Sequence, residues 1–158
     1  MWILTFLKGL PKELIVLITA ASPIIEVRGS VPLGFVLGLP PLKTFLISIV
    51  GSLIPVIPIL WFLNFLTDEL RKIKIFERFF EWLFERTRSR SKLVERYETL
   101  GLALFVSIPL PGTGVWTGCV AAYLFGLPWS NTILAVTLGT TIAAAILSAV
   151  SLGIINFF

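Results

Sequence analysis

The stretch "SPIIEVRGSVPLGF", residues 22–35, decides the fold. It places Glu26 and Arg28 two positions apart in an otherwise apolar run, between Pro23 and Pro32. On a continuous helix only residues three or four apart are neighbours, so these two charged side chains would point to different faces. A charged side chain inside a membrane segment costs at least about 2.5 kcal/mol and by default marks a functional site. We therefore expect an unwound tip that forms half of a binding site.

The composition indicates an all-α integral membrane protein. Of the 158 residues, 56% are hydrophobic and only 14% are charged, whereas soluble domains have about 25% charged residues. The length suits one membrane domain, residues 1–158. The chain lacks histidine and has one cysteine, Cys119, which we expect to be an inert buried residue. These features predict no enzyme, no metal and no cofactor beyond a coupling proton or sodium ion.

Two segments are long enough to cross a bilayer, which takes about 20 apolar residues. We expect transmembrane helices over residues 43–67, with a kink at Pro55 and Pro58, and over residues 131–158. Residues 100–126 are uncharged as well, but prolines and glycines divide them into pieces of about half that length. Such short, interrupted segments are typical of re-entrant hairpins.

The segment that joins the two halves, residues 68–99, has apolar residues at helical spacing and predicts an amphipathic helix on a membrane face. It contains nine lysine and arginine residues, so the positive-inside rule places it in the cytoplasm. Seven acidic residues lie among them and disfavour nucleic acid as a partner. The run "RTRSRSK" offers a weaker alternative, contact with anionic lipid headgroups. Residues 1–7 are too short to cross and predict an interfacial helix.

The chain also matches itself at a shift of 88 positions. Matched glycines and prolines carry more weight than matched leucines, because this apolar composition produces leucine coincidences freely. The shift pairs Pro23 with Pro111, Gly38 with Gly126, Pro40 with Pro128, Thr44 with Thr132 and Gly51 with Gly139.

This duplication predicts an inverted repeat. The first repeat, residues 1–67, would have a re-entrant hairpin at about residues 13–39 before its transmembrane helix. The second repeat, residues 100–158, would have its hairpin at about residues 100–126. The first transmembrane helix ends at the cytoplasmic linker, so the second hairpin would enter the membrane from the cytoplasm. The first hairpin, which precedes that crossing, would enter from the outside. Inverted repeats with two broken segments predict a binding site near the midplane, where the tips meet.

The first tip suits an anion. Arg28 is permanently charged and bidentate, and so is a natural clamp for phosphate or carboxylate. Glu26 would balance Arg28 in the empty site or carry a coupling proton. Ser30 would stand near the start of the next half-helix, whose free N–H groups favour anions. In the structural alternative, the pair only pins a loop.

The second tip, "PLPGTGVWTG", has no charge but much free backbone. Gly112 and Gly114 permit turns that present amides as a nest, and Thr113 or Thr117 would cap the next half-helix. Trp116 would supply a flat wall or an indole donor, or else anchor the chain at the interface. The candidate substrate- and ion-binding residues are Glu26, Arg28, Gly29, Ser30, Pro32, Pro109, Pro111, Gly112, Thr113, Gly114, Trp116, Thr117 and Gly118.

The motifs "EVRGSVP" and "PLPGTGVWTG" resemble the small multi-drug export protein family of bacteria and archaea. All the candidates except Ser30, Thr113 and Thr117 take the positions of that family's motifs. More distantly, the layout is similar to the DedA/VTT superfamily, whose members are thought to have paired re-entrant hairpins and to move lipids, including the undecaprenyl phosphate carrier. Those proteins have arginine in the second hairpin, whereas the last arginine here is Arg96.

The resemblance implies a multi-pass transporter or flippase in the plasma membrane of a bacterium or archaeon. We expect it to move an anionic amphipathic molecule or a lipid carrier such as undecaprenyl phosphate, coupled to an ion. The alternatives are an exporter of cationic drugs and a membrane scaffold or assembly factor; an enzyme of lipid phosphates ranks third. Membrane lipids are expected partners. Two spans and two hairpins offer little surface to seal a pathway, so we also expect a homodimer.

Overall fold

The computed structural model describes residues 10–70, 78, 81, 92–110 and 112–157. Every regular element within these residues is a helix, which confirms the all-α prediction. The predicted interfacial helix at residues 1–7 and most of the predicted linker helix lie outside the described residues. The helices are α2 (Lys12–Ala21), α3 (Glu26–Val36), α4 (Pro41–Leu53), α5 (Val56–Leu70), α7 (Lys92–Ser107), α8 (Val115–Phe125) and α9 (Trp129–Phe157).

Two segments are long and apolar enough to cross a membrane. Pro41–Thr67 has 27 residues and a mean hydropathy of 2.4, and Trp129–Ile154 has 26 residues and a mean hydropathy of 2.2. The first is divided into α4 and α5 by a turn at Ile54 and Pro55, as predicted, while Pro58 lies inside α5. Because prolines have no N–H, Pro55 and Pro58 each remove one bond from the helical ladder at this point.

Helix α7 extends across the boundary predicted between the linker and the second repeat. Helix α7 starts at Lys92, although the end of the charged residues predicted a start at residue 100. The physical reason is that charge does not stop a helix, and no proline or glycine interrupts residues 92–100. The last part of the predicted linker is therefore the first part of α7.

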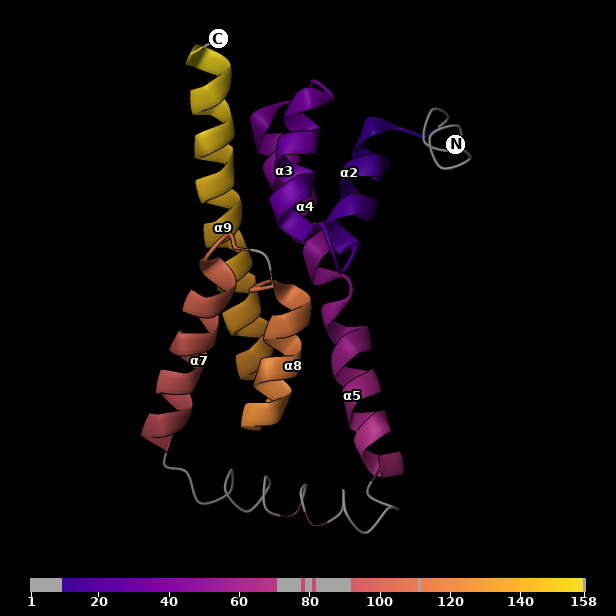
Figure 1. Ribbon diagram of the computed structural model, residues 1–158, viewed down its shortest axis with the longest axis vertical. Coiled ribbons are helices and arrows are strands. Elements are labelled where there is room, and N and C mark those ends of the chain that lie inside the picture. Colours follow the sequence, from indigo (N-terminus) through magenta and orange to yellow (C-terminus); the bar gives the residue numbers. More distant parts are fainter. Residues whose placement is uncertain (1–9, 71–77, 79–80, 82–91, 111, 158) are drawn as a thin grey trace.

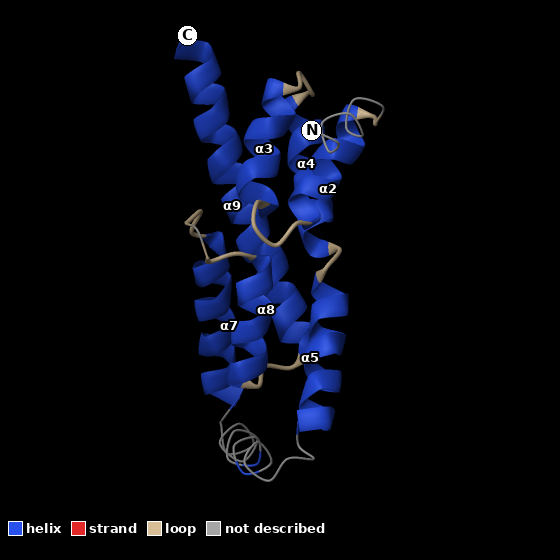
Figure 2. Ribbon diagram, turned by 45° about the vertical axis from the view of Figure 1, so that its right-hand side comes forward, coloured by secondary structure: helices blue, strands red, loops and turns tan. Residues whose placement is uncertain are grey.

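The helices form an upper and a lower group in the orientation of Figure 1. The first hairpin, α2 and α3, lies in the upper group beside α4, whereas the second hairpin, α7 and α8, lies in the lower group near α5 (Figure 1). Figure 2 shows the same separation from another side. Helix α9 rises through both groups, and α4 and α5 descend through them (Figure 1). The turns of the two hairpins therefore meet at mid-height.

The turns that lead into α4 and α9 have the same backbone construction. Gly38 and Gly126 have φ values of 74° and 69°, which glycine adopts without a steric penalty. The amides of Leu39 and Leu127 each donate to the carbonyl five residues earlier, at 3.0 and 2.9 Å. This bond is part of the Schellman pattern that ends helices. Positions 88 apart in sequence thus form equivalent turns at opposite ends of the molecule (Figure 1).

The interiors of the two groups differ in chemistry. The lower group is filled by a lower apolar cluster from α5, α7, α8 and α9, composed of Val56, Ile59, Leu60, Leu102, Ala103, Val106, Val115, Cys119, Ala122, Leu127, Ala135 and Val136. The upper group has a smaller apolar cluster between α3 and α9, namely Val27, Val31, Ala143 and Ala144. The buried side chains of α3 and α4 include the hydroxyls of Ser30, Thr44, Ser48 and Ser52, and that of Ser52 donates to the carbonyl of Ala20 in α2.

Candidate functional site

The turn of the first hairpin is closed by Ser22. Its hydroxyl donates to the carbonyl of Thr19 at 2.8 Å and accepts from the amide of Ile25 at 3.3 Å. Pro23 cannot extend α2 because it has no N–H. Helix α3 then begins at Glu26, whose φ of 49° is uncommon for a residue other than glycine.

This geometry corrects the prediction of an unwound segment around the two charges. The break covers residues 22–25, and Arg28, Gly29, Ser30 and Pro32 all lie inside α3. Helix α3 continues through Pro32 because a helix packed among neighbouring helices tolerates one missing backbone bond. The charged side chains nevertheless meet, since the left-handed backbone at Glu26 takes its side chain out of the regular helical direction.

The turn of the second hairpin follows the end of α7 at Ser107. Pro109 cannot continue the helix, and Gly112, with a φ of 85°, reverses the chain before α8 begins at Val115. Pro111 lies outside the described residues. The N-cap residue of α8 is Gly114, which has no side chain that could cap the helix.

The predicted threonine caps are wrong. The hydroxyl of Thr113 bonds the carbonyls of Ile108 and Leu110 at 2.7 and 2.9 Å, and the hydroxyl of Thr117 bonds the carbonyl of Gly114 at 3.2 Å. The hydroxyl of Thr113 therefore closes the turn onto itself, and that of Thr117 bonds within the first turn of α8. The start of α8 is left for a partner from another part of the chain.

Glu26 is that partner. Its Oε1 accepts a hydrogen bond from the amide of Trp116 at 3.2 Å, and its Oε2 accepts from Nη1 of Arg28 at 2.7 Å. Trp116 is the second residue of α8, so its amide is one of the four that a helix cannot satisfy internally. A Cβ at Gly114 would overlap the carboxylate of Glu26, so only glycine fits there. The side chain of Glu26 is 5% exposed, and its carboxylate ties the two hairpins together.

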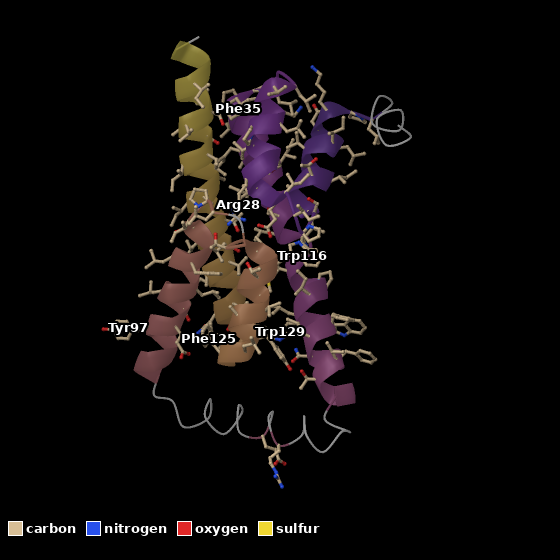
Figure 3. All side chains as sticks on the ribbon, viewed as in Figure 1. Arg28, Phe35, Tyr97, Trp116, Phe125 and Trp129 are labelled. Carbon is tan, nitrogen blue, oxygen red and sulfur yellow. The ribbon has the colours of Figure 1, made fainter. Side chains whose placement is uncertain are left out.

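Arg28 bonds the other side of the same turn. Its Nη2 donates to the hydroxyl of Thr113 at 2.7 Å and to the carbonyl of Ile108 at 3.2 Å, just beyond the end of α7. Its Nε is buried and has no hydrogen-bond partner among the described residues. Figure 3 shows Arg28 at mid-height between the two groups of helices, with Trp116 near the start of α8.

The pair thus spans the break in the second hairpin with matching charges. The C-terminal end of a helix carries partial negative charge and the N-terminal end carries partial positive charge. Arg28 lies at the end of α7, and Glu26 lies at the start of α8. Trp116 adds a further tie, because its indole Nε1 donates to the carbonyl of Ala21 at 3.4 Å, where α2 ends. Five of the predicted residues therefore meet at one site: Glu26, Arg28, Thr113, Gly114 and Trp116.

The comparison with protein families gives a match to the family described as "Putative small multi-drug export protein", over residues 26–146. The match covers more than half of the chain and includes Glu26, Arg28 and the turn of the second hairpin. The chain belongs to this family. It is a membrane protein, consistent with the apolar helices, and the family's name indicates export rather than enzymatic activity. No curated protein and no solved structure matches the chain.

In this member of the small multi-drug export family, the other predicted residues have separate positions. Gly118 lies against the lower apolar cluster, where a Cβ would be 2.7 Å from Cγ2 of Val106, which fits the close-packing alternative. At Gly29 a Cβ would overlap the side chain of Ile25. Thr117 is exposed, and Pro32 and Pro109 are half-buried. Ser30 is fully buried but makes none of the contacts of the pair.

Sequence reasoning missed the backbone groups of this site. The carbonyls of Ile108 and Ala21 accept from Arg28 and Trp116, although neither residue type attracts notice. A signal was present for Ile108, because Pro109 cannot continue α7 and so leaves its last carbonyls without helical donors. Among the described residues, no group of three histidine, cysteine, aspartate or glutamate side chains could hold a metal ion.

Proposed function

We propose that this small multi-drug export protein is an ion-coupled transporter or flippase, in which Glu26 and Arg28 alternate between binding each other and binding a proton and an anion. One observation carries the proposal. The buried carboxylate of Glu26 makes two contacts at once: one oxygen accepts from the guanidinium of Arg28, and the other accepts from a backbone amide at the N-terminus of α8. Both donors suit the anionic head of a substrate, since arginine and helix N-termini are the standard binders of phosphate and carboxylate.

The exchange follows from charge balance. In the state observed, Glu26 is the anion that neutralises Arg28. When Glu26 takes up a proton, Arg28 and the amide of Trp116 lose their ionised acceptor, and an unpaired charge at this depth is strongly unfavourable. An entering phosphate or carboxylate restores neutrality. One proton would therefore be coupled to one negative charge on the substrate, and its release would return Glu26 to Arg28.

In the membrane arrangement that we propose, the single domain is an inverted repeat with two re-entrant hairpins. Support comes from the two equivalent turns, from the opposite directions of α9 and of α4 with α5, and from the shortness of the apolar helices Tyr97–Ser107 and Val115–Phe125. The linker would face the cytoplasm of a bacterium or archaeon, and the spans would cross the plasma membrane. Apolar side chains such as Ile57, Trp61 and Val150, each more than half exposed, would contact lipids or a second copy of the chain.

The substrate class that fits is an anionic amphipathic molecule, including a lipid carrier of the undecaprenyl phosphate type. Arg28 would hold the phosphate while the apolar tail stays among lipids. The test reconstitutes the full chain in liposomes and follows the movement of a fluorescently labelled isoprenyl phosphate. We expect Arg28→Ala and Glu26→Gln to abolish movement, while Lys43→Ala, which removes an exposed cation, leaves it unchanged. Unchanged movement in the first two variants would refute the proposal.

Two alternatives give different results in the same experiment. Export of a cationic drug, tested with ethidium, would depend on Glu26 but not on Arg28. A membrane scaffold or assembly factor would move neither probe. In that case Arg28→Ala and Glu26→Gln would lower only the temperature of unfolding, because the pair ties α3 to the turn between α7 and α8.

A further inference from the structure

Buried hydroxyls without partners lie directly above the ion pair, between α3 and α4. Ser30 on α3 and Thr44 and Ser48 on α4 are each 0% exposed. Within the part of the chain that the structure describes, their hydroxyl oxygens have no hydrogen-bond partner. A buried polar group left unsatisfied costs about 1–3 kcal/mol, so proteins nearly always satisfy such groups. We call these three residues the hydroxyl column.

The column is continuous along the interface. Helices α3 and α4 are antiparallel neighbours, and a Cβ at Gly34 would be 2.9 Å from Oγ1 of Thr44, so these two residues lie opposite each other. Ser30 precedes Gly34 by one turn and Ser48 follows Thr44 by one turn. These two residues therefore face each other about 6 Å nearer the ion pair. One more turn along α3 is Glu26, whose side chain leaves the regular helical direction and reaches the start of α8.

Close packing alone does not explain the column. Small residues do allow helices to approach in membranes, but alanine or glycine serves that purpose without a buried hydroxyl. Elsewhere in the molecule, Thr19, Thr67 and Thr141 bond the carbonyl four residues earlier, at 2.7–2.9 Å. Thr132, which is 88 positions after Thr44, bonds the carbonyl of Pro128 at 3.1 Å. The hydroxyl column lacks these internal bonds, as do Thr140 and Ser148 on α9. The column therefore keeps its donors and acceptors for another group.

Two of the three positions that match the column at the shift of 88, both within the described residues, have no hydroxyl. Position 136, which is 88 after Ser48, is a valine, and position 118, which is 88 after Ser30, is a glycine. Both lie at the lower apolar cluster, next to the fully buried Cys119. Ser30 and Ser48 therefore have no hydroxyl counterparts at the matching positions below the ion pair. Ser30 lies on α3 between Arg28, which Figure 3 shows at mid-height, and Phe35, which it shows near the upper end.

We propose that the hydroxyl column holds a file of water that carries protons between Glu26 and the end of the molecule where α3 turns into α4. Each hydroxyl accepts a proton from one side and gives its own to the other, so Ser30, Thr44 and Ser48 are unchanged after each transfer. The proton that reaches Oε2 of Glu26 breaks its bond to Arg28. A metal cation suits the column less well, since its nearest carboxylate is already paired with that arginine. The inference rests on the proposed function only in taking Glu26 as the acceptor.

The experiment measures how fast a buried thiol exchanges its proton for deuterium. The full chain is reconstituted in lipid and transferred to D2O, and infrared spectroscopy follows the S–H stretching band. The native Cys119, in the lower apolar cluster, is the internal reference. The column is probed by Ser48→Cys combined with Cys119→Ala, and the matched control is Val136→Cys in the same background. We expect Ser48→Cys to exchange at least about tenfold faster than the control and Cys119.

Equal, slow exchange in Ser48→Cys and Val136→Cys would overturn the proposal. If Ser48→Cys does not fold, Ser30→Cys in the same background is measured against the same control and decides the matter in the same way. Adding Thr44→Val to Ser48→Cys should slow exchange by about tenfold, whereas adding Thr132→Val should not change it. These rates involve no transport substrate. Fast exchange without an effect of Glu26→Gln on transport would refute only the proposed function, and slow exchange with such an effect would refute only the water file.

Discussion

Two carboxylate–cation pairs of almost equal length differ in nearly everything else. Glu26 and Arg28 are 2.7 Å apart at mid-height, and their side chains are 5% and 17% exposed. Glu13 and Lys43 are 2.6 Å apart at the upper rim, and their side chains are 40% and 50% exposed. Exposed pairs contribute little to stability, because water screens the charges and the long side chains lose entropy. The mid-height pair also holds the start of α8 and the end of α7. The contribution of an ion pair to stability therefore depends more on its burial and on its further hydrogen bonds than on the distance between the two charges.

The largest effect is expected from removing the buried carboxylate. Glu26→Ala leaves Arg28 without its partner and the amide of Trp116 without an acceptor, and breaking a buried pair in this way costs about 3–5 kcal/mol. Thermal unfolding in detergent measures the loss. The double variant Glu26→Ala with Arg28→Met should recover part of it, because no unpaired charge remains. Equal stability of the wild type and Glu26→Ala would show that the pair does not hold the hairpins together.

A smaller loss is expected from Gly114→Ala, which adds a methyl group where the carboxylate of Glu26 lies. The carboxylate must move away from α8, and such overpacking costs about 1–3 kcal/mol. The matched control is Gly101→Ala in α7, where a Cβ would meet nothing within 4 Å. That control should be neutral or slightly stabilising, since alanine favours helix. A loss in Gly101→Ala as large as in Gly114→Ala would mean that the carboxylate contact is irrelevant.

Arg28→Lys separates charge from geometry within the buried pair. Lysine keeps the positive charge but cannot bond Glu26, Thr113 and the carbonyl of Ile108 together, as the planar guanidinium does. We expect a loss of about 1–2 kcal/mol, close to that of one or two hydrogen bonds. Chemical unfolding at constant detergent concentration gives this value. A loss equal to that of Glu26→Ala would assign the whole effect to the shape of arginine.

The smallest effect is expected from Lys43→Ala at the rim. Lys43 lowers the pKa of Glu13 below its usual value of 4.5. A lowered folded-state pKa contributes stability above the unfolded pKa, and this contribution is lost as the pH falls through the folded value. Lys43→Ala should therefore differ slightly from the wild type at pH 7 and coincide with it in acid. Thermal unfolding at both pH values tests this, and a difference that grows in acid would contradict it.

Local chemistry made much of this fold predictable. Uncharged length predicted the two spans, and prolines predicted the breaks at residues 23, 55 and 109, because a residue without an N–H interrupts any helix. The segment after Pro23 was harder, since Gly29 and Pro32 are poor helix formers, yet packing between α2, α4 and α9 keeps α3 helical through both. Propensity predicts what a segment prefers alone, and tertiary contacts overrode it here.

The centre of the site could be predicted only in part. Charge in an apolar run identified Glu26 and Arg28, and glycines identified the second turn. Local rules then assigned the cap of α8 to Thr113 or Thr117. The actual cap is a carboxylate 90 positions earlier in the chain, at Glu26, and a single sequence carries no information on such a pairing. The left-handed backbone at Glu26 was equally hidden, because it persists only where surrounding contacts determine it.

The turn at Pro55 has a mechanical consequence. It lies in the long span near the level at which the hairpin turns meet (Figure 1). Bending α5 against α4 there breaks no helical bond that Pro55 and Pro58 have not already removed. Among the described helices, only α9 passes this level without interruption. The molecule can therefore bend at the break between α4 and α5, whereas α9 is a continuous helix. Any rocking between its upper and lower halves would pivot on α9.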